Sequence, residues 1–142
     1  MEKQKILIAD DSEMNRALLV DILEDQYDIV EADNGAAAID LLTQCGGDFS
    51  LLLLDIMMPE MDGFEVLAYI NRYHLIDTHA VIMISADDSP ANIKRAYDLG
   101  AFDYISRPFD AAIVRRRISN TMLLYARQRH LENIIAEQFY EQ

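Results

Sequence analysis

An apolar run that ends in a carboxylate is the feature that most restricts how this chain can fold. Residues 51–54 are all leucine, and Asp55 follows them directly. Such a run is typical of a parallel strand covered on both faces, although a short buried helix has the same pattern. Pro59 and the pair Asp62-Gly63 would stop a helix within a few residues and favour the strand. Asp55 is therefore expected at the carboxyl end of a central strand. On this stretch alone, an ordinary role as a turn or capping residue fits Asp55 as well as a functional role does.

Strand-like runs recur along the chain, with helical patterns between them. Besides residues 51–55, they cover residues 6–9, 27–32, 80–85 and 102–106. After the last of them, a helical pattern runs from Asp110 almost to the end of the sequence. This alternation predicts an α/β fold in which right-handed crossovers build a doubly wound parallel sheet.

Apolar spacing predicts which side of each helix faces the sheet. The first helix carries one apolar stripe, made of Met14, Leu18, Leu19, Ile22 and Leu23. Ser89-Pro90 is a typical helix start, and the helix that follows is expected to bury Ile93, Ala96, Tyr97 and Leu99 and to stop at Gly100. In the last helix, Ile113, Val114, Ile118 and Met122 are expected to cover the sheet.

Composition narrows the class of protein and its partners. The 142 residues fit one domain with a sizeable core, and a formal net charge of -13 disfavours binding to nucleic acid or to an anionic membrane. No apolar run approaches the roughly 20 residues that span a bilayer, so a cytoplasmic location is expected. The single cysteine, Cys45, cannot form an internal disulfide. The basic run 115–117 is more typical of a solvated helix face than of a nucleic-acid site in so acidic a chain.

Polar side chains stand where four of the predicted strands end. They are Asp10 and Asp11, Asp55, Ser85 and Arg107. The carboxyl ends of parallel strands share one edge of a sheet, so these residues are expected to meet in one crevice. Each alone has an ordinary structural explanation, as a cap, a turn residue or a surface charge, but their joint placement favours a functional site.

Three carboxylates close together ionise only if a cation or a donor compensates them. Carboxylate oxygens, a backbone carbonyl and waters are the ligands that Mg²⁺ prefers. Such a site could hold a phosphoryl group on Asp55, with the carboxylate as nucleophile. The metal and Arg107 would neutralise charge on the phosphoryl oxygens, and Ser85 would donate a hydrogen bond to one of them.

The pattern as a whole resembles the receiver domain of two-component response regulators, over roughly residues 4–126. The residues that carry the resemblance are Asp10-Asp11, Asp55 with Met58-Pro59-Glu60-Met61-Asp62-Gly63, Ser85-Ala86, Tyr104 and Arg107-Pro108-Phe109. The resemblance implies a flavodoxin-like fold, with a five-stranded parallel sheet in the order 2-1-3-4-5 and five helices, the last one extended. It also implies a signalling switch rather than an enzyme.

The resemblance further implies roles for individual residues. Asp55 would accept phosphate from a sensor histidine kinase or a phosphotransfer protein. Asp10, Asp11, Asp55 and the backbone carbonyl of Met57 would bind Mg²⁺. Ser85 and Tyr104 would form a switch pair in which the hydroxyl moves toward the phosphoryl group and the ring follows. The signal would leave through the fourth helix, the fifth strand and the fifth helix.

One departure from the family pattern keeps a second function open. The family usually has lysine where this chain has Arg107, and the planar guanidinium differs in shape from a compact ammonium. The alternative is therefore a pseudo-receiver, an interaction or dimerisation module that works without phosphorylation.

Two other functions are disfavoured by residues at the predicted site. An aspartate-nucleophile phosphatase would carry an Asp-x-Asp motif, but Met57 occupies the position of the second aspartate. A flavin module is disfavoured because Asp10-Asp11-Ser12-Glu13 would repel a phosphate.

The end of the chain extends past an ordinary fifth helix. Residues 127–142 are expected to form a helical extension, as a linker to an output domain that is not in this sequence. Leu124, Leu131 and Ile135 continue an apolar stripe through it, with Gln128 on the same stripe. A homodimer through this helix is therefore expected, although the stripe covers only about two heptads, short of the three to four that identify a coiled coil.

Overall fold

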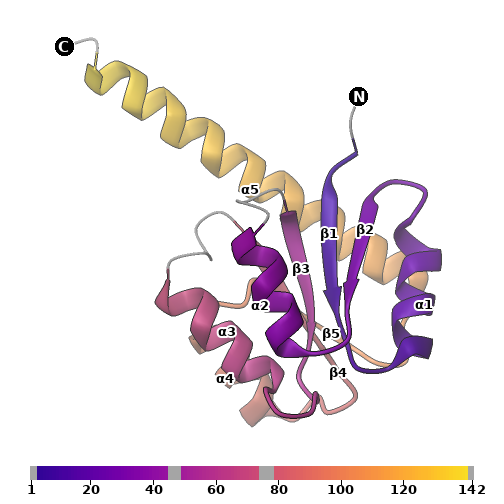
Figure 1. Ribbon diagram of the computed structural model, residues 1–142. Helices are drawn as coiled ribbons and strands as arrows, with labels where there is room; N and C mark the ends of the chain where they lie inside the picture. The colour runs from indigo at the N-terminus through magenta and orange to yellow at the C-terminus, as the bar shows by residue number, and fades with distance from the viewer. Residues whose placement is uncertain (1–2, 45–48, 74–78, 141–142) are drawn as a thin grey trace.

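A five-stranded parallel sheet with helices on both faces forms the body of the protein (Figure 1). The computed structural model describes residues 3–44, 49–73 and 79–140. In chain order the elements are β1 (Lys5–Ala9), α1 (Glu13–Leu23), β2 (Asp28–Ala32), α2 (Gly35–Gln44), β3 (Phe49–Asp55), α3 (Gly63–Arg72), β4 (Ala80–Ser85), α4 (Pro90–Asp98), β5 (Asp103–Ser106) and α5 (Ala111–Tyr140). The strand order is β2-β1-β3-β4-β5, so the flavodoxin-like prediction is confirmed. Cys45 lies outside the described residues.

The leucines of β3 explain why this strand lies in the middle of the sheet. All four are 0% exposed, and they alternate between two cores. Leu52 and Leu54 pack on the side of α2, α3 and α4. Leu51 and Leu53 pack on the side of α1 and α5. A strand that is apolar on both faces is stable only when helices cover both faces, and this strand ends at Asp55.

The helices bury a narrower stripe than their sequence pattern predicts. In α1, Leu19 and Leu23 are buried, whereas Met14 is 74% exposed and Leu18 is 48% exposed. Tyr97 in α4 and Ile113 in α5 are also about half exposed, so their predicted burial is wrong. A helix that lies on a twisted sheet touches it along one line of side chains, and the residues at the border of the apolar stripe remain in solvent. These border residues form part of the apolar surface.

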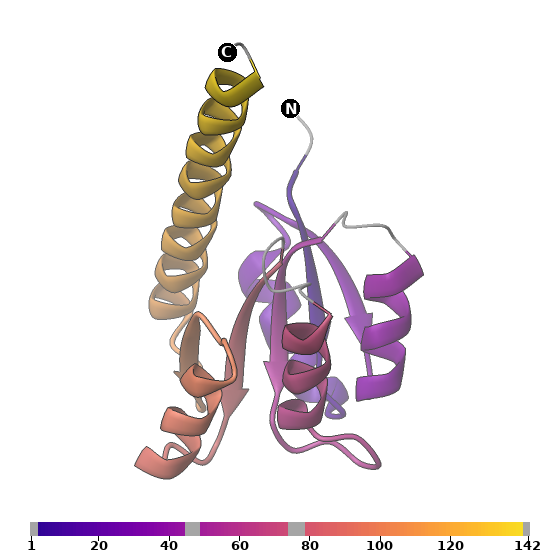
Figure 2. The same ribbon diagram turned by 90° about the vertical axis from the view of Figure 1, so that its left-hand side faces the viewer.

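The last helix is the longest element and projects beyond the sheet (Figure 2). Its first part is held by the buried residues Val114, Ile118, Thr121 and Met122. Thr121 can be buried because its hydroxyl donates to the carbonyl of Arg117 at 2.7 Å. No helix in the described part of the chain is long and apolar enough to cross a membrane.

Gly63 allows the chain to return sharply after β3. The Gly63 N–H donates to the carbonyl of Ile56 at 2.8 Å, and Asp62 caps α3 through a capping box with Glu65. A Cβ atom on Gly63 would lie 2.2 Å from the backbone oxygen of Asp55. Only glycine therefore permits α3 to begin this close to the end of β3.

Gly63→Ala is expected to destabilise the fold by about 2 kcal/mol or more, because the added methyl group overlaps the backbone of Asp55. Helix propensity alone would predict the opposite, a gain of about 1 kcal/mol. Urea unfolding measures the difference, and Ala68→Gly, at an exposed position of the same helix, reports the propensity effect alone. A Gly63→Ala variant as stable as wild type would contradict the close approach.

Candidate functional site

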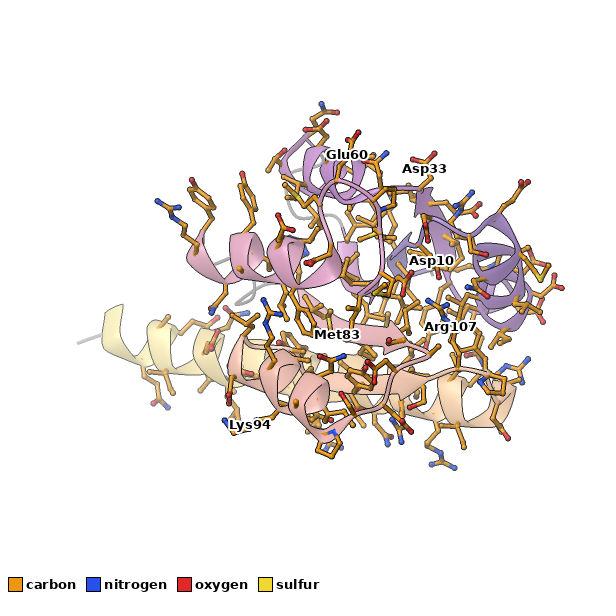
Figure 3. All side chains as sticks on the ribbon, turned by 90° about the horizontal axis from the view of Figure 1, so that it is seen from below. Asp10, Asp33, Glu60, Met83, Lys94 and Arg107 are labelled. Carbon is orange, nitrogen blue, oxygen red and sulfur yellow. The ribbon has the colours of Figure 1, made fainter. Side chains whose placement is uncertain are left out.

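The ends of four strands bring the predicted polar residues to one edge of the sheet. Asp10 and Asp55 are 0% and 1% exposed, and Ser85 at the end of β4 is 1% exposed. Backbone hydrogen bonds hold the flanking segments: the Asp10 N–H donates to Ala32 at 3.1 Å, and the Arg107 N–H donates to Ser85 at 2.9 Å. Figure 3 shows Asp10 and Arg107 lying close together at this edge.

Asp10, Asp11 and Asp55 form the acidic cluster that the sequence predicts. One carboxylate oxygen from each lies within 4.8 Å of the others, with Asp10 and Asp55 buried and Asp11 exposed. Asp10 Oδ1 accepts the Ser12 N–H at 2.8 Å, whereas Asp10 Oδ2 is buried and has no hydrogen-bond partner in the structure. A buried carboxylate oxygen without a donor is costly, and a cation in the cluster would satisfy it. The donor set is all oxygen, which fits Mg²⁺.

The guanidinium of Arg107 lies inside this cluster. Its Nη2 donates to Asp55 Oδ1 and stands 3.6 Å from Asp10 Oδ2. The side chain is 22% exposed, and its Nε is buried without a hydrogen-bond partner. Arg107 therefore supplies part of the positive charge that the buried carboxylates require.

The surroundings of Asp55 work against its negative charge. Burial, followed by the charge of Asp10, raises the pKa of Asp55 from 3.8 to about 7. The charge of Arg107, a hydrogen bond from the backbone of Met57 and the hydrogen bond from Arg107 oppose this rise. Near neutral pH the carboxyl group thus lies close to its titration midpoint, and a cation bound at the site would favour the ionised carboxylate.

The residues of the predicted switch pair contact one another through a loop. Ser85 Oγ accepts the Asp87 N–H at 3.0 Å, and the hydroxyl of Tyr104 donates to the carbonyl of Asp87. Tyr104 is 4% exposed, so its ring lies in the core. Met57 is different: its side chain is 72% exposed and its backbone N–H faces Asp55.

Two residues of the site were not predicted from the sequence. Arg16 Nη1 donates to the backbone carbonyl of Asp10 at 2.7 Å, and Arg16 Nε pairs with Glu31 at 3.1 Å. Asp87 accepts hydrogen bonds from Ser89, Asn92 and Tyr104, and it donates its N–H to Ser85. A signal for Asp87 was present, because an aspartate two residues before the Ser89 cap is typical of a structured turn.

An apolar groove of about 440 Å³ opens beside Arg107. It lies between α1 and the turn that follows β5, where Leu18 and Ile22 face Pro108 and Phe109. Leu18, which the sequence pattern assigned to the core, therefore lines this groove instead.

The comparisons with known proteins agree with this geometry. Residues 6–119 match the family model described as the response regulator receiver domain. The chain is 36% identical over 124 residues to the chemotaxis protein CheY of Halobacterium salinarum, covering 86% of this chain and 98% of that protein. It is 35% identical over 113 residues to a probable cyclic di-GMP phosphodiesterase of Vibrio cholerae, covering 80% of this chain but only 25% of that protein.

Solved structures show the same fold. The CheY chain in a CheX-CheY-BeF3-Mg complex from Borrelia burgdorferi is 30% identical, with a TM-score of 0.79 over 84% of this chain and 89% of that chain. A probable two-component response regulator with a GGDEF domain is 27% identical, with a TM-score of 0.81 over 87% of this chain and 50% of that chain. The present chain thus spans the whole of some relatives and a quarter to a half of others.

Asp55→Asn is expected to stabilise the metal-free protein by about 1–3 kcal/mol at about pH 8. The folded-state pKa of Asp55 lies above its unfolded value, so the folded protein holds a proton that the unfolded chain releases. The stability linked to this group is present below about pH 4 and is lost as the pH rises toward 7. The advantage of Asp55→Asn should therefore shrink as the pH falls.

Urea unfolding in EDTA at about pH 5 and about pH 8 measures this dependence. Asp21→Asn, an exposed change on α1, makes the same substitution away from the site. An equal advantage of Asp55→Asn at both pH values would rule out a raised pKa at this position.

Proposed function

This chain belongs to the response regulator receiver family, and on that basis we propose that it is a phosphorylation-controlled switch with Asp55 as the acceptor. The donor would be a sensor histidine kinase or a phosphotransfer protein in the cytoplasm. The observation that supports this most directly is the position of Asp55: a buried carboxylate at a strand end, with two further carboxylates and one arginine around it. Nothing in this chemistry requires a turnover reaction on a separate substrate, so the domain is proposed to signal rather than to act as an enzyme.

The proposed transfer is a displacement at phosphorus. An oxygen of Asp55 attacks, the bond between phosphorus and the donor histidine nitrogen breaks, and the neutral imidazole leaves. Asp10, Asp11, Asp55 and the backbone carbonyl of Met57 would hold Mg²⁺, which when bound supplies positive charge to the phosphoryl oxygens. Arg107 adds a second positive charge from the chain, and the Ser85 hydroxyl can turn to donate to a phosphoryl oxygen.

We propose that the phosphoryl donor docks on the apolar groove between α1 and the turn after β5. The groove borders Arg107, so a protein seated in it would have its histidine next to Asp55. Leu18 in the groove is 48% exposed, and Met14, one turn earlier in α1, is 74% exposed. The acidic chain as a whole does not favour nucleic acid or membrane as a partner of this domain.

The surface formed by α4, β5 and α5 is the proposed exit for the signal. Three side chains link these elements: the Tyr97 hydroxyl donates to Asp103 at 3.3 Å, and Arg117 Nη1 lies 3.7 Å from the same carboxylate. Arg117 also donates to the backbone carbonyl of Tyr104. A shift of the Tyr104 backbone would therefore change a contact of α5.

The second candidate is the pseudo-receiver that signals without phosphate. The contact of Arg107 with Asp55 and its closeness to Asp10 support it, because the guanidinium partly fills the space in which a metal and a phosphoryl group would be bound. A lysine at this position would present one compact ammonium instead of a planar fork.

Incubation with acetyl phosphate and Mg²⁺ separates the two candidates. Wild type is expected to gain the mass of one phosphoryl group, and Asp55→Asn is expected to gain none. Arg107→Lys keeps the charge and is expected to react faster, because the smaller head releases the carboxylates to the metal. Intact-protein mass spectrometry measures the yield, and no gain in wild type together with a gain in Arg107→Lys would establish the pseudo-receiver.

We further propose that residues 4–126 act as the receiver domain and that residues 127–142 act as a helical extension that dimerises or leads to an output domain. Exposed apolar residues continue along one side of α5: Ile113 is 49% exposed, Leu124 49%, Leu131 59% and Ile135 65%. Their spacings place them within one stripe of the helix. With Leu124 and Leu131 at d positions, Gln128 falls at an a position, where a polar residue sets the register of a pair.

Charges beside the stripe favour a parallel pair of helices. In that heptad frame Arg127 is a g residue and Glu132 is the e residue of the next heptad. In a parallel coiled coil, g pairs with the following e of the partner helix, so Arg127 and Glu132 would form ion pairs on both sides of the seam. Two copies of the extension are thus complementary in charge as well as apolar along one side.

Leu131→Asp is expected to reduce dimerisation of the full chain at least about tenfold, since it places a charge in the apolar seam. Leu123→Asp makes the same change at a residue that is 50% exposed but lies off the stripe, and it should leave the mass unchanged. Sedimentation equilibrium measures both variants, together with residues 1–126. Equal monomeric masses for residues 1–142 and 1–126 would remove the dimer.

A further inference from the structure

Asp87 bonds to both residues of the switch pair through its backbone. Its N–H donates to Ser85 Oγ at 3.0 Å, and its carbonyl accepts the hydroxyl of Tyr104. Ser85 Oγ is the acceptor in its bond with Asp87, so the Ser85 hydroxyl proton is not used in that bond and can be donated elsewhere.

The carboxylate of the same residue holds the start of α4. Asp87 Oδ1 accepts the Ser89 N–H at 3.0 Å, and Oδ2 accepts from Asn92 Nδ2 at 3.0 Å. Ser89 is the N-cap of α4, and its hydroxyl in turn accepts the Asn92 N–H at 3.4 Å. A negative charge at a helix N-terminus is favourable. The backbone of Asp87 thus binds the switch pair, and its side chain binds the first turn of α4.

We infer that Asp87 is the positioning residue that couples the hydroxyl of Ser85 to the first turn of α4. The inference rests on the proposed function, because it gives a route from Asp55 to the α4 surface. If the Ser85 hydroxyl turns toward an oxygen bound on Asp55, its Oγ moves away from the Asp87 N–H that it now accepts. One of the two bonds between Asp87 and the switch pair is then broken, and the loop that Asp87 anchors is free to rearrange. The rearrangement would alter the hydrogen bond that Asn92 donates to the Asp87 carboxylate, and so the first turn of α4.

A double-mutant cycle tests this coupling without phosphate. Ser85→Ala removes the acceptor of the Asp87 N–H and is expected to speed amide hydrogen exchange at Asn92 and Ile93 about fivefold. Asp87→Asn keeps an acceptor for the Ser89 N–H but replaces the oxygen that binds Asn92 with an amide group. In that background Ser85→Ala should change exchange at Asn92 and Ile93 by less than about twofold.

Asp88→Asn is the matched control, because Asp88 is the next residue, is also exposed and loses the same charge. The fivefold effect of Ser85→Ala should persist in this background. An effect of equal size in the Asp87→Asn background, or no effect in the wild-type background, would overturn the inference. Neither result depends on Asp55 accepting phosphate, so the proposed function stands or falls separately.

A second measurement connects the coupling to the switch. Beryllofluoride with Mg²⁺, a phosphoryl mimic, is expected to shift the Ser85 amide resonance equally in wild type and in Asp87→Asn. The resonances of the first turn of α4 should shift at least about twofold less in Asp87→Asn than in wild type or Asp88→Asn. Equal shifts of the α4 resonances in all three proteins would overturn the role of Asp87. An unchanged Ser85 amide resonance in all three proteins would instead count against the phosphorylation switch itself.

Discussion

Two carboxylates buried side by side are the constraint on which the rest of this structure depends. Asp10 and Asp55 lie at adjacent strand ends, where low solvent access makes each negative charge raise the free energy of the other. The raised pKa of Asp55 lowers this cost because the carboxyl group can hold a proton, and the positive charge of Arg107 offsets a further part of it. Asp10 Oδ2 nevertheless remains buried without a hydrogen-bond donor. The site is therefore stable enough to fold and still electrostatically incomplete, which is the condition a cation-dependent acceptor requires.

Arg107 gives this site a character that a lysine would not. A guanidinium near both carboxylates is a cation tethered to the chain, and it binds where a divalent ion would bind. The two cations can share the cluster only if the arginine withdraws from one carboxylate, because like charges repel at this distance. The affinity of the cluster for a metal ion would thus depend on where the Arg107 side chain lies. The same residue borders the apolar groove beside α1, so its withdrawal would also change the surface offered to a phosphoryl donor.

The sequence predicted the sheet and the placement of the polar residues at its edge well, because both follow from strand patterns. An apolar run such as residues 51–54 has one stable environment, and Asp55 follows it directly, so its place at the sheet edge is determined by the backbone alone. The exposed Met14, Tyr97 and Ile113 were assigned to the core wrongly, since the width of a helix contact depends on sheet twist and neighbouring helices. The bonds of Asp87 were missed for a related reason: they join a loop to β5, and such contacts depend on tertiary packing.

The route from the site to the long helix depends on Arg117 in α5. Arg117 contacts the Tyr104 carbonyl and Asp103, and it lies one turn after Ile113, where the exposed stripe that continues to Ile135 begins. A helix transmits rotation along its axis with little loss because its backbone hydrogen bonds keep it stiff. Any change at Tyr104 that alters the Arg117 contact therefore acts at the base of the same stripe that is proposed to pair with a second copy. The buried residues on the neighbouring side of the helix, Val114 and Ile118, hold the helix on the sheet, so the change can turn the extension without detaching it.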